Sequence, residues 1–262
     1  MTGSSANAAV PEDHTPPEWT HKSAVTTCLL HAHAQLGTYI TDVTSITPHR
    51  WAIRSSVIPR EPDWNFDLSE QGDTVAESWP WWQPLTVETP DSGTRTRASV
   101  TEELWMRYAI EPAAARQSGV SNTVTLHQRP NDEFCDVFSR AFELDHRSTE
   151  TYTSALLGSS PPDNVHINWL TRVEKQRIVA VASLHTTNEH GFLYNVGTDP
   201  RHRGHGHASA IIRAALHLAG HNNSRDVWLQ CEPASEAQKI YTTAGFEPVG
   251  SANTYLHPES QQ

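Results

Sequence analysis

A glycine-rich turn between a strand-like segment and an amphipathic helix is the feature that most constrains the fold of this chain. Residues 191–198 are rich in aromatic and branched side chains, which suit a strand, and the Asp199–Pro200 pair ends it. After the turn, apolar side chains recur with the spacing of one helical face, at Ala208, Ile211, Ile212, Ala215, Leu216 and Ala219. We predict that Gly220 ends this helix. The predicted order of elements is therefore strand, turn, helix.

The chemistry of the turn favours a phosphate ligand. The start of a helix exposes N–H groups that have no intrahelical partner, and the positive end of the helix dipole attracts anions. Gly204 and Gly206 lack a Cβ, so the backbone can approach a ligand closely and its amides can form an anion-binding nest. The turn has neither the Lys-Ser/Thr pair of a Walker A loop nor the third glycine of the dinucleotide fingerprint. The alternative is a basic surface turn before a well-capped helix.

Two motifs of the second half resemble those of the GNAT acyltransferase superfamily. Residues 203–208 read R-x-x-G-x-A, which is similar to the family's coenzyme A pyrophosphate loop, R/Q-x-x-G-x-G/A. An overlapping match starts two residues earlier and agrees less well with the preceding proline and with the helix start. Residues 237–246 resemble the second family motif, A-x-x-L-Y-x-x-x-G-F. The resemblance extends over residues 123–257.

The resemblance implies a GNAT fold, which is an α/β (α+β) fold with a mixed central sheet flanked by helices. The local signals agree with the family order β-α-α-β-β-β-α-β-α-β. Strand signals lie at 123–127, 165–173, 177–186, 191–198, 227–232 and 253–257, and helix signals at 134–142, 152–156, 208–219 and 237–244. Residues 174–176 join two of these strands as a hairpin.

The resemblance also implies roles for individual residues. Val196, Gly197 and Thr198 are expected to line the pantetheine arm, which would bind as an added strand, although the family usually has an aliphatic residue in place of Thr198. A backbone N–H near Val196 would polarise the thioester carbonyl. Tyr241 is expected to protonate the leaving thiolate, and its alternative role is that of a core residue. The residues expected to hold the pyrophosphate are Arg203, Gly204, His205, Gly206, His207 and Ala208.

The implied activity is acyl transfer from acetyl-CoA, or another acyl-CoA, to the amine of a small molecule that attacks the thioester directly. His185, Glu232 and Glu143 are chemically able to act as the general base, and a water chain is an equal alternative. Two other functions stay open. One is a CoA-binding sensor without transferase activity, and the other is a GNAT protein with an altered acyl donor or hydrolytic chemistry.

The first half of the chain has no phosphate-turn motif. We expect residues 1–20 to be a disordered leader, residues 21–120 a degenerate GNAT-like domain, and residues 121–258 the catalytic domain. The GNAT-like assignment rests on a weak resemblance of residues 63–84 to the first half of tandem GNAT proteins. An unrelated α+β cap or an N-terminal lid are the alternatives. Local signals predict helices at 24–36 and 101–110 and a strand at 51–58.

Tryptophan is concentrated in this first half. Seven of the nine tryptophans precede residue 106, and core packing explains most of them. Trp81 or Trp82 would be able to line an acceptor pocket.

Composition excludes several classes of partner. The 262 residues include 30 acidic and 19 basic side chains, a formal charge of −11, which argues against binding to nucleic acid or to an anionic membrane. There is no long apolar run and no signal-peptide pattern, so we expect a cytoplasmic protein, either a monomer or a homodimer. The three widely spaced cysteines are expected to be free thiols. Sixteen histidines are present, five of them near the turn, but their spacing predicts no metal site.

Overall fold

The structure of the protein is a computed structural model, and it describes residues 41–47, 50–55, 66–69, 83–88, 101–111, 124–158, 165–187 and 189–254. Some of the predicted features lie outside the described residues. These are the leader at 1–20, the helix at 24–36, and the tryptophan-rich segment with Trp81 and Trp82.

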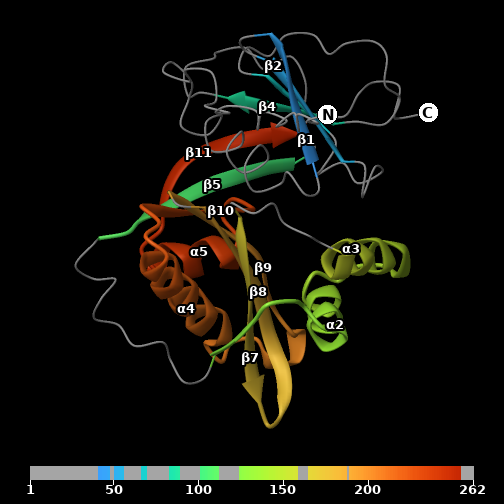
Figure 1. Cartoon of the computed structure of the whole chain (residues 1–262), viewed down its shortest axis with the longest axis vertical. Helices are drawn as coiled ribbons and strands as arrows, with labels where there is room; N and C mark the ends of the chain where they lie inside the picture. The colour runs from blue at the N-terminus through green and yellow to red at the C-terminus, as the bar shows by residue number, and fades with distance from the viewer. Residues whose placement is uncertain are drawn as a thin grey trace, which may run out of the picture.

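The second half of the chain has the element order that the sequence predicts. The elements are β6 (Val124–His127), α2 (Asp132–Ala141), α3 (His146–Gly158), β7 (His166–Glu174), β8 (Arg177–Thr186), β9 (His190–Thr198), the short 3-10 helix η4 (Pro200–His202), α4 (His207–His221), β10 (Asp226–Cys231), α5 (Glu236–Thr243) and β11 (Glu247–Thr254). Helices α2 and α3 lie on one side of the β7–β9 strands, and α4 and α5 lie on the other (Figure 1). The fold is therefore a mixed sheet flanked by helices, as predicted.

The local chemistry explains where several elements begin and end. Lys175 and Gln176 join β7 to β8 with φ of 49° and 65°, the left-handed pair that a two-residue hairpin turn of type I′ requires. Helix α5 begins at Ser235, whose hydroxyl accepts a hydrogen bond from the N–H of Gln238, and ends before Gly245 at φ 97°. The predicted end of α4 at Gly220 is wrong by one residue. The helix continues to His221, and Asn223 supplies the left-handed residue that follows it.

Strand β5 (Thr101–Ala109) occupies a segment for which the sequence predicts a helix, so that prediction is wrong. The strand is antiparallel to β10 on one side and to β11 on the other. Trp105 and Met106 are both fully buried, in the two hydrophobic clusters on opposite faces of the sheet. The segment is rich in good helix formers such as Glu, Leu, Met and Arg, but pairing along both edges outweighs this local preference.

Strand β11 begins at Glu247, earlier than the predicted strand at 253–257, because its first residues pair with β5. On its other edge it pairs with β4 (Gln83–Glu88). The sheet then continues through β3 (Phe66–Ser69), β2 (Arg50–Ser55) and β1 (Thr41–Thr47), and β2 confirms the strand predicted at 51–58. The 11 described strands thus form one sheet in the order β1-β2-β3-β4-β11-β5-β10-β9-β8-β7-β6.

The expected domain boundary between residues 120 and 121 stays a prediction. Strand β5 precedes it in the sequence and nevertheless lies between two strands of the second half.

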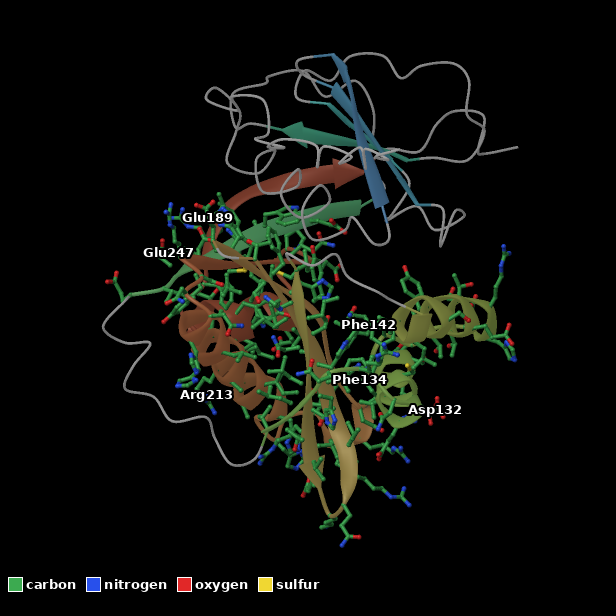
Figure 2. All side chains as sticks on the ribbon, viewed as in Figure 1. Asp132, Phe134, Phe142, Glu189, Arg213 and Glu247 are labelled. Atoms are coloured by element: carbon green, nitrogen blue, oxygen red, sulfur yellow. The ribbon has the colours of Figure 1, made fainter. Side chains whose placement is uncertain are left out.

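The core of the second half consists of two apolar layers separated by the sheet. One layer contains Phe134, Trp169 and Trp228 beneath α2 and α3, and the other contains Ile211 and Ile212 of α4. Figure 2 shows Phe134 directed from α2 toward the strands and Asp132 directed away from them. The amphipathic α2 therefore covers the sheet with its apolar face.

We expect replacement of Trp105 by alanine to lower the free energy of unfolding by about 3–5 kcal/mol, because the side chain is only 1% exposed and its loss leaves a large cavity. Arg107→Ala is the control, since this neighbouring β5 side chain is exposed and rests over the Trp228 ring in a cation–π contact at 5.7 Å. Denaturant unfolding of the full chain measures the free energy of unfolding of each variant. Equal stabilities of the two variants would contradict a structural role for β5.

Candidate functional site

Strands β9 and β10 run parallel but pair over only three residues. The register begins with His190 opposite Asp226 and ends with Phe192 opposite Trp228. Beyond this point β9 stays paired with β8 on its other edge, and β10 stays paired with β5. Within the described part of the chain, no ladder joins the later parts of β9 and β10, so the two strands diverge. The residues predicted to line a pantetheine arm, 196–198, all lie on the stretch of β9 that β10 leaves unpaired.

Strand β9 bulges within the same stretch. Its register with β8 shifts between Val181 and Ser183, where two residues of β9, Asn195 and Val196, stand against one residue of β8. Asn195 is left-handed, with φ 57°. Its Nδ2 donates a hydrogen bond of 3.0 Å to Ser183 Oγ, and His185 Nε2 lies 3.2 Å from the same oxygen. The sequence analysis did not identify this buried polar group, although a serine and a histidine two residues apart in an apolar strand were a signal for it.

The predicted phosphate turn connects β9 to α4 through η4. Gly204 and Gly206 are left-handed, with φ of 79° and 75°, and a Cβ built at either glycine would have no atom within 4 Å. Gly206 is the N-cap of α4, and no side chain caps this helix. Side chains do cap α2 and α5, through Asn131 and Ser235. The N–H groups at positions 207–209 therefore have neither an intrahelical acceptor nor a side-chain cap.

A buried carboxylate organises the start of the turn. Asp199 is 2% exposed, and its carboxylate accepts hydrogen bonds from Arg140 Nε at 2.9 Å and from Arg201 Nη2 at 3.1 Å. It also accepts from the Arg201 N–H. These bonds hold the pKa of Asp199 well below its usual range, and the side-chain bond from Arg201 contributes most. Sequence reasoning did not identify Arg140, because α2 is 59 residues away from Asp199 along the chain.

The end of α2 packs directly against the turn. Arg203 Nη2 donates a hydrogen bond of 2.8 Å to the carbonyl oxygen of Ala141, and its Nη1 lies 3.8 Å from Glu143 Oε1. A Cβ built at Gly197 would lie 2.7 Å from Ala141 Cβ and 3.1 Å from the Phe142 ring. Only glycine therefore allows β9 and α2 to approach this closely at position 197.

Two of the predicted histidines stack beside the turn. The rings of His205 and His207 are 6.0 Å apart and nearly parallel, and His205 Nδ1 lies 2.9 Å from the Arg203 carbonyl oxygen. His207 is buried, with Nε2 3.4 Å from Glu174 Oε2, and burial lowers its pKa. No group of three or more His, Cys, Asp or Glu side chains among the described residues is placed to hold a metal ion. Ala208 follows in the first turn of α4.

Tyr241 lies on α5 and is 6% exposed. Its ring contacts Phe246 at 6.0 Å, and it belongs to the same apolar cluster against which Val196 packs. Burial raises the pKa of the Tyr241 phenol far above its usual value, and Cys231 on the diverging part of β10 adds to the shift. The phenol therefore keeps its proton at neutral pH.

The three candidate bases occupy different surroundings. Glu143 is beside Arg203 at the phosphate turn, and Glu232 is exposed just after β10. His185 is buried between the rings of Trp169 and Tyr194, at 6.4 and 4.9 Å, and burial lowers its pKa to about 3. His185 is therefore neutral at physiological pH. The structure does not bring these three side chains together.

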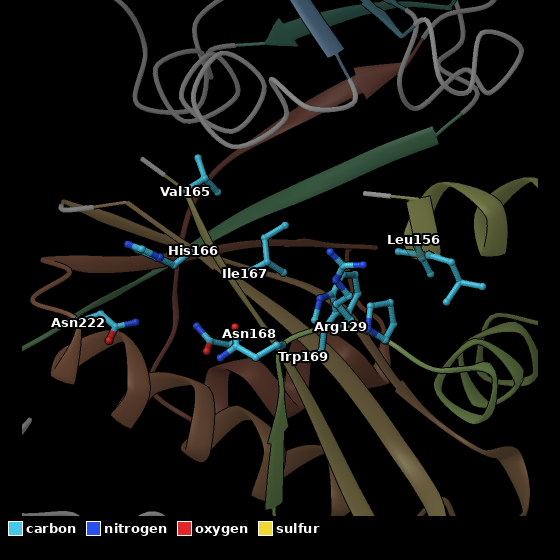
Figure 3. Close-up of a pocket in the computed structure, with 11 residues that line it drawn as sticks. Arg129, Leu156, Val165, His166, Ile167, Asn168, Trp169 and Asn222 are labelled. Carbon is cyan, nitrogen blue, oxygen red and sulfur yellow. The ribbon is translucent and has the colours of Figure 1, made fainter. Parts of the chain in front are cut away.

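A separate cavity of about 420 Å³ lies along the outer edge of the sheet (Figure 3). Strand β6 pairs with β7 only as far as Trp169. On this outer edge, the beginning of β7 therefore has no partner among the described strands, although its other edge pairs with β8. Figure 3 shows Ile167 and Trp169 on β7 and Leu156 on α3 among the residues that line the cavity. None of the predicted site residues lines the cavity.

Comparison with known proteins agrees with this geometry. Residues 131–246 match the model of the acetyltransferase (GNAT) family. No protein of curated function matches the sequence. None of the described helices is both long and apolar enough to cross a membrane.

Similar solved structures cover most of the chain. A functionally unknown conserved protein from Staphylococcus epidermidis has a TM-score of 0.60 at 12% identity, over 84% of this chain and 95% of that chain. A GCN5-related N-acetyltransferase from Kribbella flavida has a TM-score of 0.58 at 14% identity, over 90% and 96%. Another from Sphaerobacter thermophilus has a TM-score of 0.52 at 14% identity, over 81% of each chain. At these identities the likeness establishes the fold.

Residues 131–246 form a domain of the acetyltransferase (GNAT) family. This membership supports acyl-CoA-dependent acyl transfer as its general activity.

We expect Gly197→Ala to lower the free energy of unfolding by about 1–3 kcal/mol, because the new methyl group must push α2 away from β9. Gly158→Ala at the end of α3 is the matched control, since a Cβ there meets no atom within 4 Å. Thermal unfolding of the two variants measures the difference. A Gly197→Ala protein as stable as the control would contradict the close packing.

We also expect the stability of the protein to fall as the pH drops below about 6.5. The unfolded chain binds a proton at His185 below the ordinary pKa of 6.5, whereas the native state does not until about pH 3. This one group contributes a slope of up to about 1.4 kcal/mol per pH unit in that interval. Urea unfolding at several pH values should give a shallower dependence for His185→Gln, and parallel curves would contradict the burial of a neutral histidine.

Proposed function

We propose that the protein is an acyl-CoA-dependent N-acyltransferase that transfers an acetyl group to the amine of a small molecule. The observation that carries the proposal is the uncapped start of α4, preceded by two left-handed glycines, at the end of an unpaired strand edge. An anionic group fits the first feature and an extended, amide-containing chain fits the second. Acyl-CoA contains both.

The pyrophosphate is proposed to bind to the backbone amides of residues 203–208. The helix dipole of α4 adds to the attraction. Open space at Gly204 and Gly206 supports this assignment, because a ligand can approach the backbone there. Arg203 is anchored to the end of α2, with its guanidinium about half exposed, so it can contribute charge at the rim of the turn.

The pantetheine arm is proposed to lie along residues 196–198, on the edge of β9 that β10 leaves unpaired. Its amides would then replace the missing strand neighbour. Acyl-CoA supplies an activated thioester, and the acceptor amine attacks its carbonyl carbon as the C–S bond breaks. A backbone N–H near Val196 would stabilise the negative charge that develops on the carbonyl oxygen.

Tyr241 is proposed to donate its proton to the departing thiolate. Its raised pKa keeps the phenol protonated at neutral pH, which is the form that an acid needs. Tyr241 belongs to the apolar cluster against which Val196 and Cys231 both pack, which supports a position beside the gap between the strands. The general base, the cytoplasmic location and the monomeric or dimeric state stay predictions.

We expect Tyr241→Phe to lower kcat by about 100-fold, because the leaving thiolate loses its acid, and to leave the Kd for CoA nearly unchanged. The measurement offers acetyl-CoA with a panel of small amines and follows the release of free CoA. Tyr108→Phe is the matched control, since it removes a phenol that packs against the same Phe246 ring, at 5.7 Å. A Tyr241→Phe enzyme with wild-type turnover would refute the acid role.

The same assay separates the proposal from its alternatives. Tight CoA binding by calorimetry without amine-dependent CoA release would identify a sensor. CoA release that does not depend on any amine would indicate hydrolysis.

A further inference from the structure

We propose that Ser183 and Asn195 are positioning residues that fix the bulge of β9 and so aim the Val196 N–H toward the acyl carbonyl. The inference rests on the proposed function. It goes further because it assigns a role to a side-chain contact that the family motifs do not contain.

The left-handed conformation of Asn195 needs an interaction that stabilises it. A left-handed conformation costs a residue with a Cβ about 1–2 kcal/mol, although asparagine tolerates it better than most. Without a further interaction, Asn195 could return to the extended conformation that its neighbours have. The 3.0 Å hydrogen bond from Asn195 Nδ2 to Ser183 Oγ ties the side chain to the adjacent strand and favours the left-handed form.

The acceptor of this bond is itself held rigidly. Ser183 is fully buried on β8, and its oxygen also lies 3.2 Å from Nε2 of the buried His185. A hydroxyl can accept one hydrogen bond and donate another, so it can link the asparagine to a neutral imidazole. The rings of Trp169 and Tyr194 pack against His185 and restrict its movement. The contact is therefore anchored in the core and not at the surface.

The bulge changes what the backbone offers at this point. Where two residues stand against one, the ladder with β8 cannot satisfy both in the regular way. On the other edge of β9 there is no β10 partner at this position. A fixed left-handed Asn195 thus turns the following amide out of the regular ladder and holds it toward the gap between the strands. A donor whose direction is set before the reaction stabilises a developing oxyanion most effectively.

The experiment compares Ser183→Ala, Asn195→Gly and the double variant in the full chain, using the best acceptor from the amine panel. Each single variant removes the same hydrogen bond, and glycine keeps access to the left-handed conformation. We expect each to lower kcat by about tenfold with the Kd for CoA unchanged. The double variant should lose no more than a single one, because both residues act through one contact. Ser139→Ala is the control, since it removes another buried serine hydroxyl, for which the structure gives no hydrogen-bond partner.

A second readout does not depend on turnover. Amide hydrogen exchange of the β9 residues that pair with β8 on either side of the bulge should become faster in Ser183→Ala and Asn195→Gly than in the wild type, while amides on β7 exchange as before. The Ser139→Ala protein should show no such change.

The outcomes distinguish the inference from the function on which it rests. If the wild type transfers acetyl groups and the Ser183→Ala and Asn195→Gly variants keep wild-type kcat, the positioning role is wrong and the proposed function stands. Additive losses in the double variant, or unchanged exchange at the β9 residues beside the bulge, also overturn the inference. If the wild type releases no CoA with any amine, the proposed function fails and the positioning role fails with it.

Discussion

Two parallel strands usually continue their ladder while both remain extended, but β9 and β10 stop after three paired residues. The remaining part of each strand is held by its other neighbour, β8 or β5, so the divergence does not destabilise either one. Helix α4, which connects the two strands, packs beneath β8 and β9 through small and branched side chains such as Ile211 and Ala215. The gap and the phosphate turn thus have a common cause, because the turn is the start of the helix that connects the separated strands.

Helix α2 also contributes contacts that hold the turn between β9 and α4. Arg140 bonds to Asp199, Ala141 packs on Gly197, and the Ala141 carbonyl accepts from Arg203. These contacts join consecutive residues of α2 to the end of β9 and to the turn. The carboxylate of Asp199 also neutralises part of the charge of Arg140 and Arg201. In the proposed site, the backbone amides and Arg203 would therefore supply much of the attraction for the pyrophosphate.

The sequence predicted the parts of the structure whose cause is local. Helix periodicity predicted α2, α4 and α5, and glycine in a strand–turn–helix context predicted the turn that joins β9 to α4. The sequence failed where the cause is a distant partner. Residues 101–109 contain helix formers and become a strand only because β10 and β11 pair with both edges. The Arg140–Asp199 and Asn195–Ser183 bonds likewise join residues on different elements, and no local spacing relates them.

The position of β11 has a consequence for how the chain reaches this structure. This strand comes last among those described, yet it lies between β4 and β5, which are both made much earlier. Until it emerges from the ribosome, β5 can pair only with β10, and β4 lacks one of its two neighbours. The two ends of the sheet therefore join in a single late event, and a high share of long-range pairing makes that event slow. During synthesis the exposed edges of β4 and β5 would be the places most open to pairing with another chain.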